Sequence, residues 1–146
     1  MPRLAAIALV LALAGLAGCR PAPEKKLIGK WKYDAVQAIA EGGDGKAAPS
    51  PLGNILKTLG VRAETEIEFK ADGTLTTTWA ALYQEHSSAP KRWKVLAAKE
   101  NELTLEIEDR PQPGRMHLFI DDDDHIRVES PMGGKYLTFT RIKEEG

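Results

Sequence analysis

From residue 64 to residue 142 the sequence alternates apolar and polar positions at a period of two, with short breaks at turn residues. This periodicity is typical of antiparallel strands that bury one face and expose the other. The positions on the predicted inner face are Ile67, Phe69, Leu75, Thr77, Trp79, Trp93, Val95, Ala97, Leu103, Leu105, Ile107, Met116, Leu118, Ile120, Ile126, Val128, Leu137 and Phe139. With a first strand over residues 27–33, the pattern predicts an all-β fold, an eight-stranded antiparallel up-and-down meander.

Hairpin registers follow because facing residues must lie on the same side of a sheet. The predicted pairs are Phe69 with Leu75, Ala97 with Leu103, Ile107 with Met116, and Ile120 with Ile126. The left-handed turn positions then fall to Gly73, Asn101 and an aspartate of residues 122–124. These registers also place Lys94 opposite Glu106, and such opposite charges on the solvent face support the predicted pairing.

The chain between the first two strands has a different pattern. Ser50 and Pro51 are typical of a helix N-cap followed by proline at the first helical position, and Gly60 is a stop signal. Apolar residues at helical spacing are Leu52, Ile55, Leu56 and Leu59. We expect a short helix between strands 1 and 2 that caps one end of the sheet. Alternatively, Val36 and Ile39 extend the first strand and the helix lies outside.

The N-terminus has the parts of an export signal. Arg3 is followed by an apolar stretch over residues 4–16, and small residues precede the only cysteine, Cys19. This stretch is too short and too closely followed by polar chain to predict a spanning helix. The sequence thus predicts a signal peptide over residues 1–18.

The Leu-Ala-Gly-Cys run that ends at Cys19 resembles the lipobox of bacterial lipoproteins. The resemblance implies that the chain is cleaved before Cys19, whose thiol is joined to diacylglycerol and whose new amine is acylated with a chain such as palmitate. More than one acyl chain gives stable anchoring. Arg20 stands where an aspartate favours inner-membrane retention, which implies attachment to the outer membrane, facing the periplasm, if the source is Gram-negative. The alternative is an ordinary secretory signal with a chance cysteine.

The chain after the signal peptide consists of a lipidated tether over residues 19–26 and one domain over residues 27–143. Removing Arg3 with the signal leaves 19 of the 20 basic residues against 21 acidic ones. A near-neutral chain without a basic stripe argues against a nucleic-acid partner. With Cys19 as the only cysteine, the domain has no internal disulfide.

Gly29-Lys30-Trp31 resembles the Gly-x-Trp signature of lipocalins and bacterial lipocalin-like domains. Those families place an arginine of the final strand across the tryptophan ring, and Arg141 occupies the corresponding strand here. The resemblance implies a lipocalin-like barrel in which Arg141 makes a cation–π contact with Trp31. Residues 69–74 are similar to a hairpin of small bacterial lipocalin-like lipoproteins.

The predicted interior is almost entirely apolar, which suits an acyl chain or another small apolar ligand. Candidate ligand-binding residues are Phe69, Trp79, Trp93, Leu105, Leu118 and Phe139. Alternatively these side chains fill the barrel, as in many small eight-stranded barrels. The protein is then an interaction or scaffolding module for an envelope protein, which it contacts through exposed loops such as residues 82–91 or 131–135.

Candidate chemistry elsewhere is sparse. The acidic run at residues 121–124 lacks the glycine of a typical calcium loop, so it predicts a solvated hairpin tip. His117 lies on the outer face near Glu106 and Glu129, either in a charge ladder or as a zinc ligand at a subunit contact. His86 has adjacent serines but no orienting acid, so no triad is indicated. We expect no metal, no cofactor and no enzymatic activity.

Overall fold

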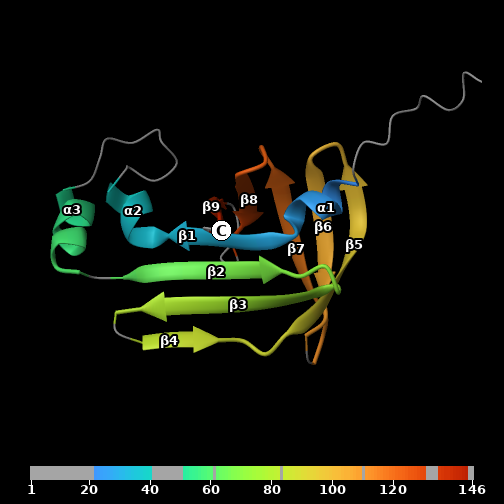
Figure 1. Cartoon of the computed structure of the whole chain (residues 1–146), viewed down its shortest axis with the longest axis horizontal. Helices are drawn as coiled ribbons and strands as arrows, with labels where there is room; N and C mark the ends of the chain where they lie inside the picture. The colour runs from blue at the N-terminus through green and yellow to red at the C-terminus, as the bar shows by residue number, and fades with distance from the viewer. Residues whose placement is uncertain are drawn as a thin grey trace, which may run out of the picture.

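The computed structural model describes residues 22–40, 51–60, 62–82, 84–109, 111–130 and 135–144. Cys19, Ser50 and most of the 131–135 loop lie outside these residues. Nine strands and three short helices occur in the described parts of the chain (Figure 1). The helices are α1 (Pro23–Leu27), α2 (Ala35–Ala40) and α3 (Pro51–Thr58). The strands are β1 (Gly29–Asp34), β2 (Ala63–Phe69), β3 (Thr74–Ala81), β4 (Gln84–Ser87), β5 (Lys91–Lys99), β6 (Glu102–Ile107), β7 (Gly114–Ile120), β8 (His125–Glu129) and β9 (Tyr136–Ile142).

Antiparallel pairing closes a ring in the order β1-β2-β3-β5-β6-β7-β8-β9, in which β9 pairs back onto β1. The predicted eight-stranded antiparallel meander is therefore confirmed as a closed barrel. The extra strand β4 pairs only with β3, within the stretch that the sequence predicted to be a connection. All four residues of β4 are exposed, so no alternation of burial marked it as a strand.

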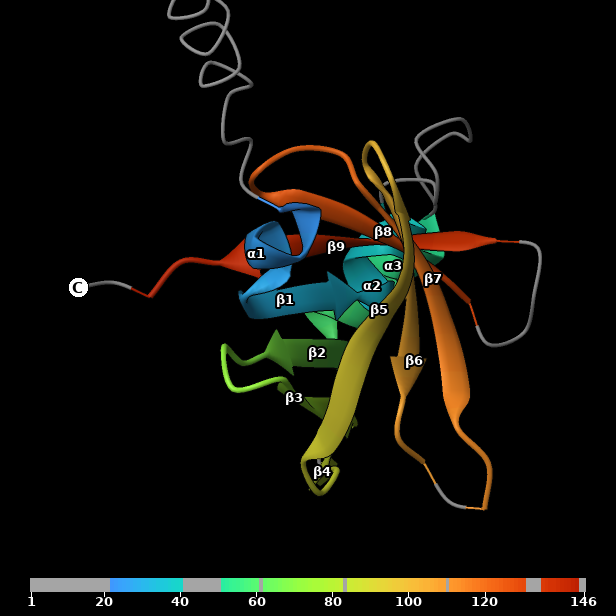
Figure 2. The ribbon, with the colours of Figure 1, turned by 90° about the vertical axis from the view of Figure 1, so that its right-hand side faces the viewer.

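Three ladders of the ring are short, namely those between β3 and β5, between β1 and β9, and between β7 and β8, and Figure 2 shows these strands. Between β3 and β5 the ladder consists of Thr74 with Arg92 and Leu75 with Lys91. Between β1 and β9 it consists of Lys30 with Ile142, Trp31 with Arg141, and Lys32 with Thr140. Beyond Lys32, β1 runs on to Asp34 and the chain turns into α2. The wall between β1 and β9 is consequently open past the last of these pairs.

The interior is filled by one packed cluster. Its buried members are Leu27, Trp31, Ile67, Phe69, Leu75, Leu103, Leu105, Ile107, Leu118, Ile120, Ile126, Val128 and Phe139. Leu27 belongs to α1, although the sequence placed it in the first strand and placed Pro23 in an extended tether. Both expectations are wrong, because residues 23–27 form a helix. Leu27 is fully buried, and its carbonyl accepts a hydrogen bond from Trp31 Nε1 at 2.8 Å.

Two hairpins have the predicted register, Phe69 with Leu75 and Ile120 with Ile126. Gly73 has a φ of 83°, as its left-handed position requires. The residues of the second loop, 121–124, have no positive φ, so the predicted left-handed aspartate is wrong. There Asp122 Oδ1 accepts a hydrogen bond from the backbone N–H of Asp124 at 2.7 Å.

The β5–β6 hairpin departs from the predicted register by one residue. A β-bulge between Val95 and Ala97 makes Ala98, instead of Ala97, the partner of Leu103. The turn shortens accordingly, and Glu100, not Asn101, takes the left-handed conformation with a φ of 54°. A bulge adds one residue to one strand, so the pairs before it keep their register. Lys94 still faces Glu106.

The β6–β7 pairing is displaced from the prediction by two residues. Met116 faces Leu105 instead of Ile107, and Ile107 faces Gly114. A shift of two keeps every side chain on its predicted face. Pro111 and Pro113 lie in the connection between this last pair, where no ladder bond is required of them, since proline has no N–H to donate to a ladder.

In the described part of the chain between β1 and β2 there are two helices, not one, at the end of the barrel opposite α1 (Figure 1). α3 covers the predicted residues, and Gly60 ends it with a φ of 69°. The alternative in which Val36 extends the first strand is wrong, because Val36 is buried within α2. Asp34 Oδ1 accepts a hydrogen bond from the N–H of Gln37 at 2.9 Å, and this cap begins the helix. Within the described residues, no helix is long and apolar enough to cross a membrane.

Candidate ligand-binding cleft between β1 and β9

Most of the predicted ligand-binding residues are part of the packed core. Phe69, Leu105, Leu118 and Phe139 are at most 3% exposed and contact one another through the central cluster. Trp93 packs against this cluster with its ring edge-on to Phe69, at a centroid distance of 5.4 Å. The structure therefore brings these five residues together as the filling of the barrel.

Trp79 is separate from that group. Its side chain is 48% exposed, and its ring stacks on His86 of β4 with the centroids 4.3 Å apart. The sequence predicted Trp79 as a buried inner-face residue but did not predict β4, whose His86 is its partner in the ladder.

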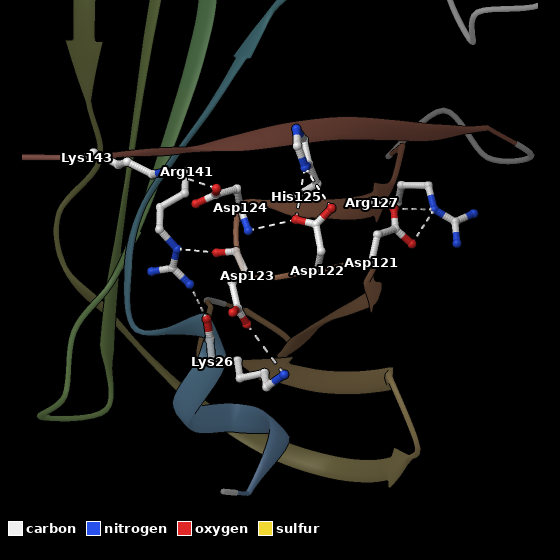
Figure 3. Close-up of polar contacts among 9 residues, drawn as sticks. All are labelled: Lys26, Asp121, Asp122, Asp123, Asp124, His125, Arg127, Arg141 and Lys143. Atoms are coloured by element: carbon white, nitrogen blue, oxygen red, sulfur yellow. Dashed lines mark hydrogen bonds and ion pairs between the residues drawn. The ribbon is translucent and has the colours of Figure 1, made fainter.

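Gly29, Trp31 and Arg141 meet at the other end, as the resemblance implied. The guanidinium carbon of Arg141 lies 4.1 Å from the Trp31 ring centroid. Arg141 Nη1 donates to the carbonyl of Ile28 at 2.8 Å. Its Nε donates to the carbonyl of Asp123 at 2.7 Å, as Figure 3 shows. Arg141 thus joins the N-terminal segment, the closing strand and the β7–β8 hairpin, which is a structural role.

A cleft of about 600 Å³ opens where β1 and β9 separate. Its walls are the end of β1 with α2 on one side and β9 with the start of β8 on the other. Tyr33 and Leu137, which line it, also pack against the core, and the Tyr33 ring lies 5.6 Å from the ring of Phe139. The cleft therefore has an apolar base that is continuous with the barrel interior.

Polar side chains form a row across the cleft on the outer face. Thr140 of β9 is paired with Lys32 of β1 on one side and with His125 of β8 on the other. Lys32 Nζ lies 3.0 Å from Glu64 Oε1, and the other oxygen of Glu64 is 3.0 Å from Arg62. Partial burial raises the pKa of Glu64, but the hydrogen bonds from Lys32 and Arg62 outweigh it and hold the pKa below its ordinary value.

The third member of the row, His125, is oriented by the acidic hairpin (Figure 3). His125 Nδ1 lies 2.9 Å from each oxygen of Asp122. The pKa of Asp122 is lowered, first by the hydrogen bond from the Asp124 backbone and then by that from His125. The other aspartates of the run make ion pairs, namely Asp121 with Arg127, Asp123 with Lys26, and Asp124 with Lys143.

His117 has one of its two predicted neighbours, Glu129, whereas the other, Glu106, lies elsewhere. Its Nε2 lies 2.6 Å from Glu102, and its Nδ1 lies 3.0 Å from the hydroxyl of Tyr136 and 3.8 Å from Glu129. Glu106 is displaced by the β6–β7 register and pairs with Lys94 at 2.8 Å. In the part of the chain that the structure describes, no group of three or more His, Cys, Asp or Glu side chains could hold a metal ion.

Sequence reasoning missed the cleft because its position depends on where β1 leaves β9. Lys32 and Thr140 look like ordinary outer-face residues of two strands far apart in the chain. One signal was available, since Asp34 precedes Gln37 at the spacing of a helix cap. That signal locates the end of β1, but not the space that its departure leaves beside β9.

Comparisons with known proteins place the chain only loosely. No family model matches the sequence, and no curated protein matches it. Among solved structures, a fatty acid binding protein of Schistosoma mansoni in complex with arachidonic acid is similar over 84% of this chain and 100% of its own, with 14% sequence identity and a TM-score of 0.39. So distant a similarity identifies neither a family nor a ligand for this chain.

Proposed function

We propose that this protein is a non-enzymatic binding protein of the cell envelope, anchored through lipid on Cys19, which holds a small amphipathic molecule in the β1–β9 cleft. The lipobox resemblance supports the anchor, and Arg20 after the cysteine supports attachment to the outer membrane if the source is Gram-negative. The cleft itself carries the binding role. Its volume of about 600 Å³ is that of a typical ligand site, and an apolar base with a polar row suits a molecule with both characters.

This proposal moves the ligand from the barrel centre to its wall. The predicted apolar ligand was to lie among Phe69, Leu105, Leu118 and Phe139, which are packed against one another. A ligand there would have to displace well-packed side chains, whereas the cleft is already open. The tail of an amphipathic molecule can contact Tyr33 and Leu137 without disturbing the core.

Native mass spectrometry tests the binding role. The sample is residues 20–146, purified gently after export, since this segment contains every helix and strand of the structure. We expect a stoichiometric extra mass that is lost on denaturation and identifies an amphipathic compound. An apo mass that persists when envelope lipids are offered would contradict the proposal.

The second candidate is a protein-interaction module, favoured by the apolar surface of α3. Leu52 and Ile55 of α3 and Leu59, which directly follows it, are 56%, 54% and 67% exposed, so three large apolar side chains are exposed on one short segment. Crosslinking in the intact envelope distinguishes the candidates. Capture of a defined protein that is lost in the Ile55→Glu variant, together with a clean apo mass, would favour the interaction module.

A further inference from the structure

We propose that the ligand of the β1–β9 cleft carries an anionic head group, a carboxylate or a phosphate, and that Lys32 binds this head group. The inference rests on the proposed function, because it assigns the ligand class of the same cleft. It is carried by the charges that line the cleft and by their place relative to its apolar base.

Positive charge predominates among the described residues that line the cleft. Lys32 and Arg141 are cationic, and Asp34 is the acidic member of the lining. The guanidinium of Arg141 donates to main-chain carbonyls, including those of Ile28 and Asp123. Since a carbonyl is neutral, these bonds fix the guanidinium in place without cancelling its charge. An anion in the cleft therefore gains from its field.

Lys32 also keeps charge and donors for a ligand. The carboxylate of Glu64 is shared between Lys32 and Arg62, each at 3.0 Å, so Lys32 does not have this carboxylate to itself. Glu66 is the ladder partner of Lys32, and Glu66 and Glu85 also act on Arg62. An ammonium has three N–H donors, and the contact with Glu64 occupies one direction only. The Lys32 side chain is 35% exposed, so solvent or a ligand reaches it.

The position of Lys32 suits a head group. Lys32 and Thr140 form the last pair of the β1–β9 ladder, and the strands separate immediately beyond them. Tyr33 and Leu137 lie past this point and form the apolar base. A molecule with its head at Lys32 and the Thr140 hydroxyl would place its tail over that base. The charges of the lining and the geometry of the cleft therefore both favour an anionic amphiphile as the ligand.

Chain-matched probes test the inference on residues 20–146. The probes are dodecanoate, dodecyl phosphate, neutral monolauroylglycerol and dodecyltrimethylammonium, each titrated below its micelle concentration by isothermal calorimetry. We expect both anions to bind roughly tenfold more tightly than the neutral probe and the cation to bind most weakly, as a charged hydrogen bond implies. Added salt should weaken the binding of the anions more than the binding of the neutral probe. The anion that binds more tightly, dodecanoate or dodecyl phosphate, shows whether the site favours a carboxylate or a phosphate.

Variants locate the effect. Lys32→Gln should weaken the anions about tenfold and leave the neutral probe unchanged. The matched control is Lys30→Gln, because Lys30 lies on the same face of β1, pairs with Glu144 at 3.6 Å and does not line the cleft. Thr140→Val should lower the affinity for the anionic probes independently of Lys32, because it removes the hydroxyl beside the proposed head group. Circular dichroism confirms that each variant is folded.

Different failures have different meanings. The head-group inference is overturned if the neutral probe binds as tightly as the anions. It is also overturned if Lys30→Gln lowers the affinity for the anions as much as Lys32→Gln does. In both cases the cleft stays a binding site. If none of the four probes binds, the proposed function fails and this inference fails with it.

Discussion

Gly29 and Arg141 fit against each other so closely that a β-carbon on Gly29 would lie 2.6 Å from Arg141 Nη1. Gly29 also has a φ of 131°, which L side chains rarely adopt. Arg141 cannot move aside cheaply, because its guanidinium is bonded to the Ile28 carbonyl and lies over Trp31. The glycine of the Gly-x-Trp signature is therefore explained by the arginine at the other end of the chain.

Gly29→Ala should destabilise the protein by about 1–3 kcal/mol, since it adds backbone strain and forces Arg141 from its bonds. Urea unfolding measures the change. The matched control is Gly114→Ala, because a β-carbon there meets nothing within 4 Å. We expect the control to be close to neutral, and equal losses in both variants would contradict the role given to Arg141.

Leu105→Ala should lower the free energy of unfolding by about 2–5 kcal/mol, because Leu105 is fully buried and its truncation leaves a cavity. Leu96, which is 42% exposed on the neighbouring strand, provides the comparison. Leu96→Ala should cost no more than about 0.5 kcal/mol. A small effect of Leu105→Ala would indicate a loosely packed interior, which is what an interior ligand would require.

Glu100→Gly should stabilise the protein by roughly 0.5–1 kcal/mol, because glycine adopts a positive φ without steric cost. Thermal unfolding checks this expectation. Asn101→Gly distinguishes the observed turn from the one that the sequence predicted, since Asn101 does not have a positive φ. Stabilisation by Asn101→Gly and not by Glu100→Gly would restore the predicted register.

Asp72 should make the stability of the β2–β3 hairpin depend on pH. Its carboxylate accepts hydrogen bonds from the Thr74 hydroxyl at 2.6 Å and the Thr74 backbone at 2.9 Å, which lower its pKa below the ordinary 3.8. A lowered pKa contributes stability that is present above the unfolded value and lost as pH falls through the folded value.

The comparison is with Asp72→Asn, which keeps an oxygen acceptor but not the charge. Wild type should be the more stable at neutral pH, and the difference should disappear in acid. Denaturant midpoints measured from about pH 7 to about pH 2 show the trend. A difference that is constant over this range would mean that the charge contributes nothing.

The sequence by itself determined the eight strands of the ring, their faces and the hairpin pairing at Phe69 with Leu75 and at Ile120 with Ile126. Alternation of apolar and polar residues is local, so it identified Phe69, Leu75 and the turn at Gly73 without knowledge of the rest of the fold. The same holds for α3, which has its own start and stop signals. A two-residue displacement, as at Met116, left every face correct because the side-chain period is also two.

Only the tertiary structure decided where the ring closes and where it stays open. The bulge before Ala97, the exposed strand β4 and the short ladder between Lys32 and Thr140 leave no mark on a periodic pattern. Each depends on how a curved sheet brings distant strands together, since closure is set by the whole set of strands. The cleft is a consequence of that closure, so its residues are visible as a site only once β1 and β9 stand side by side.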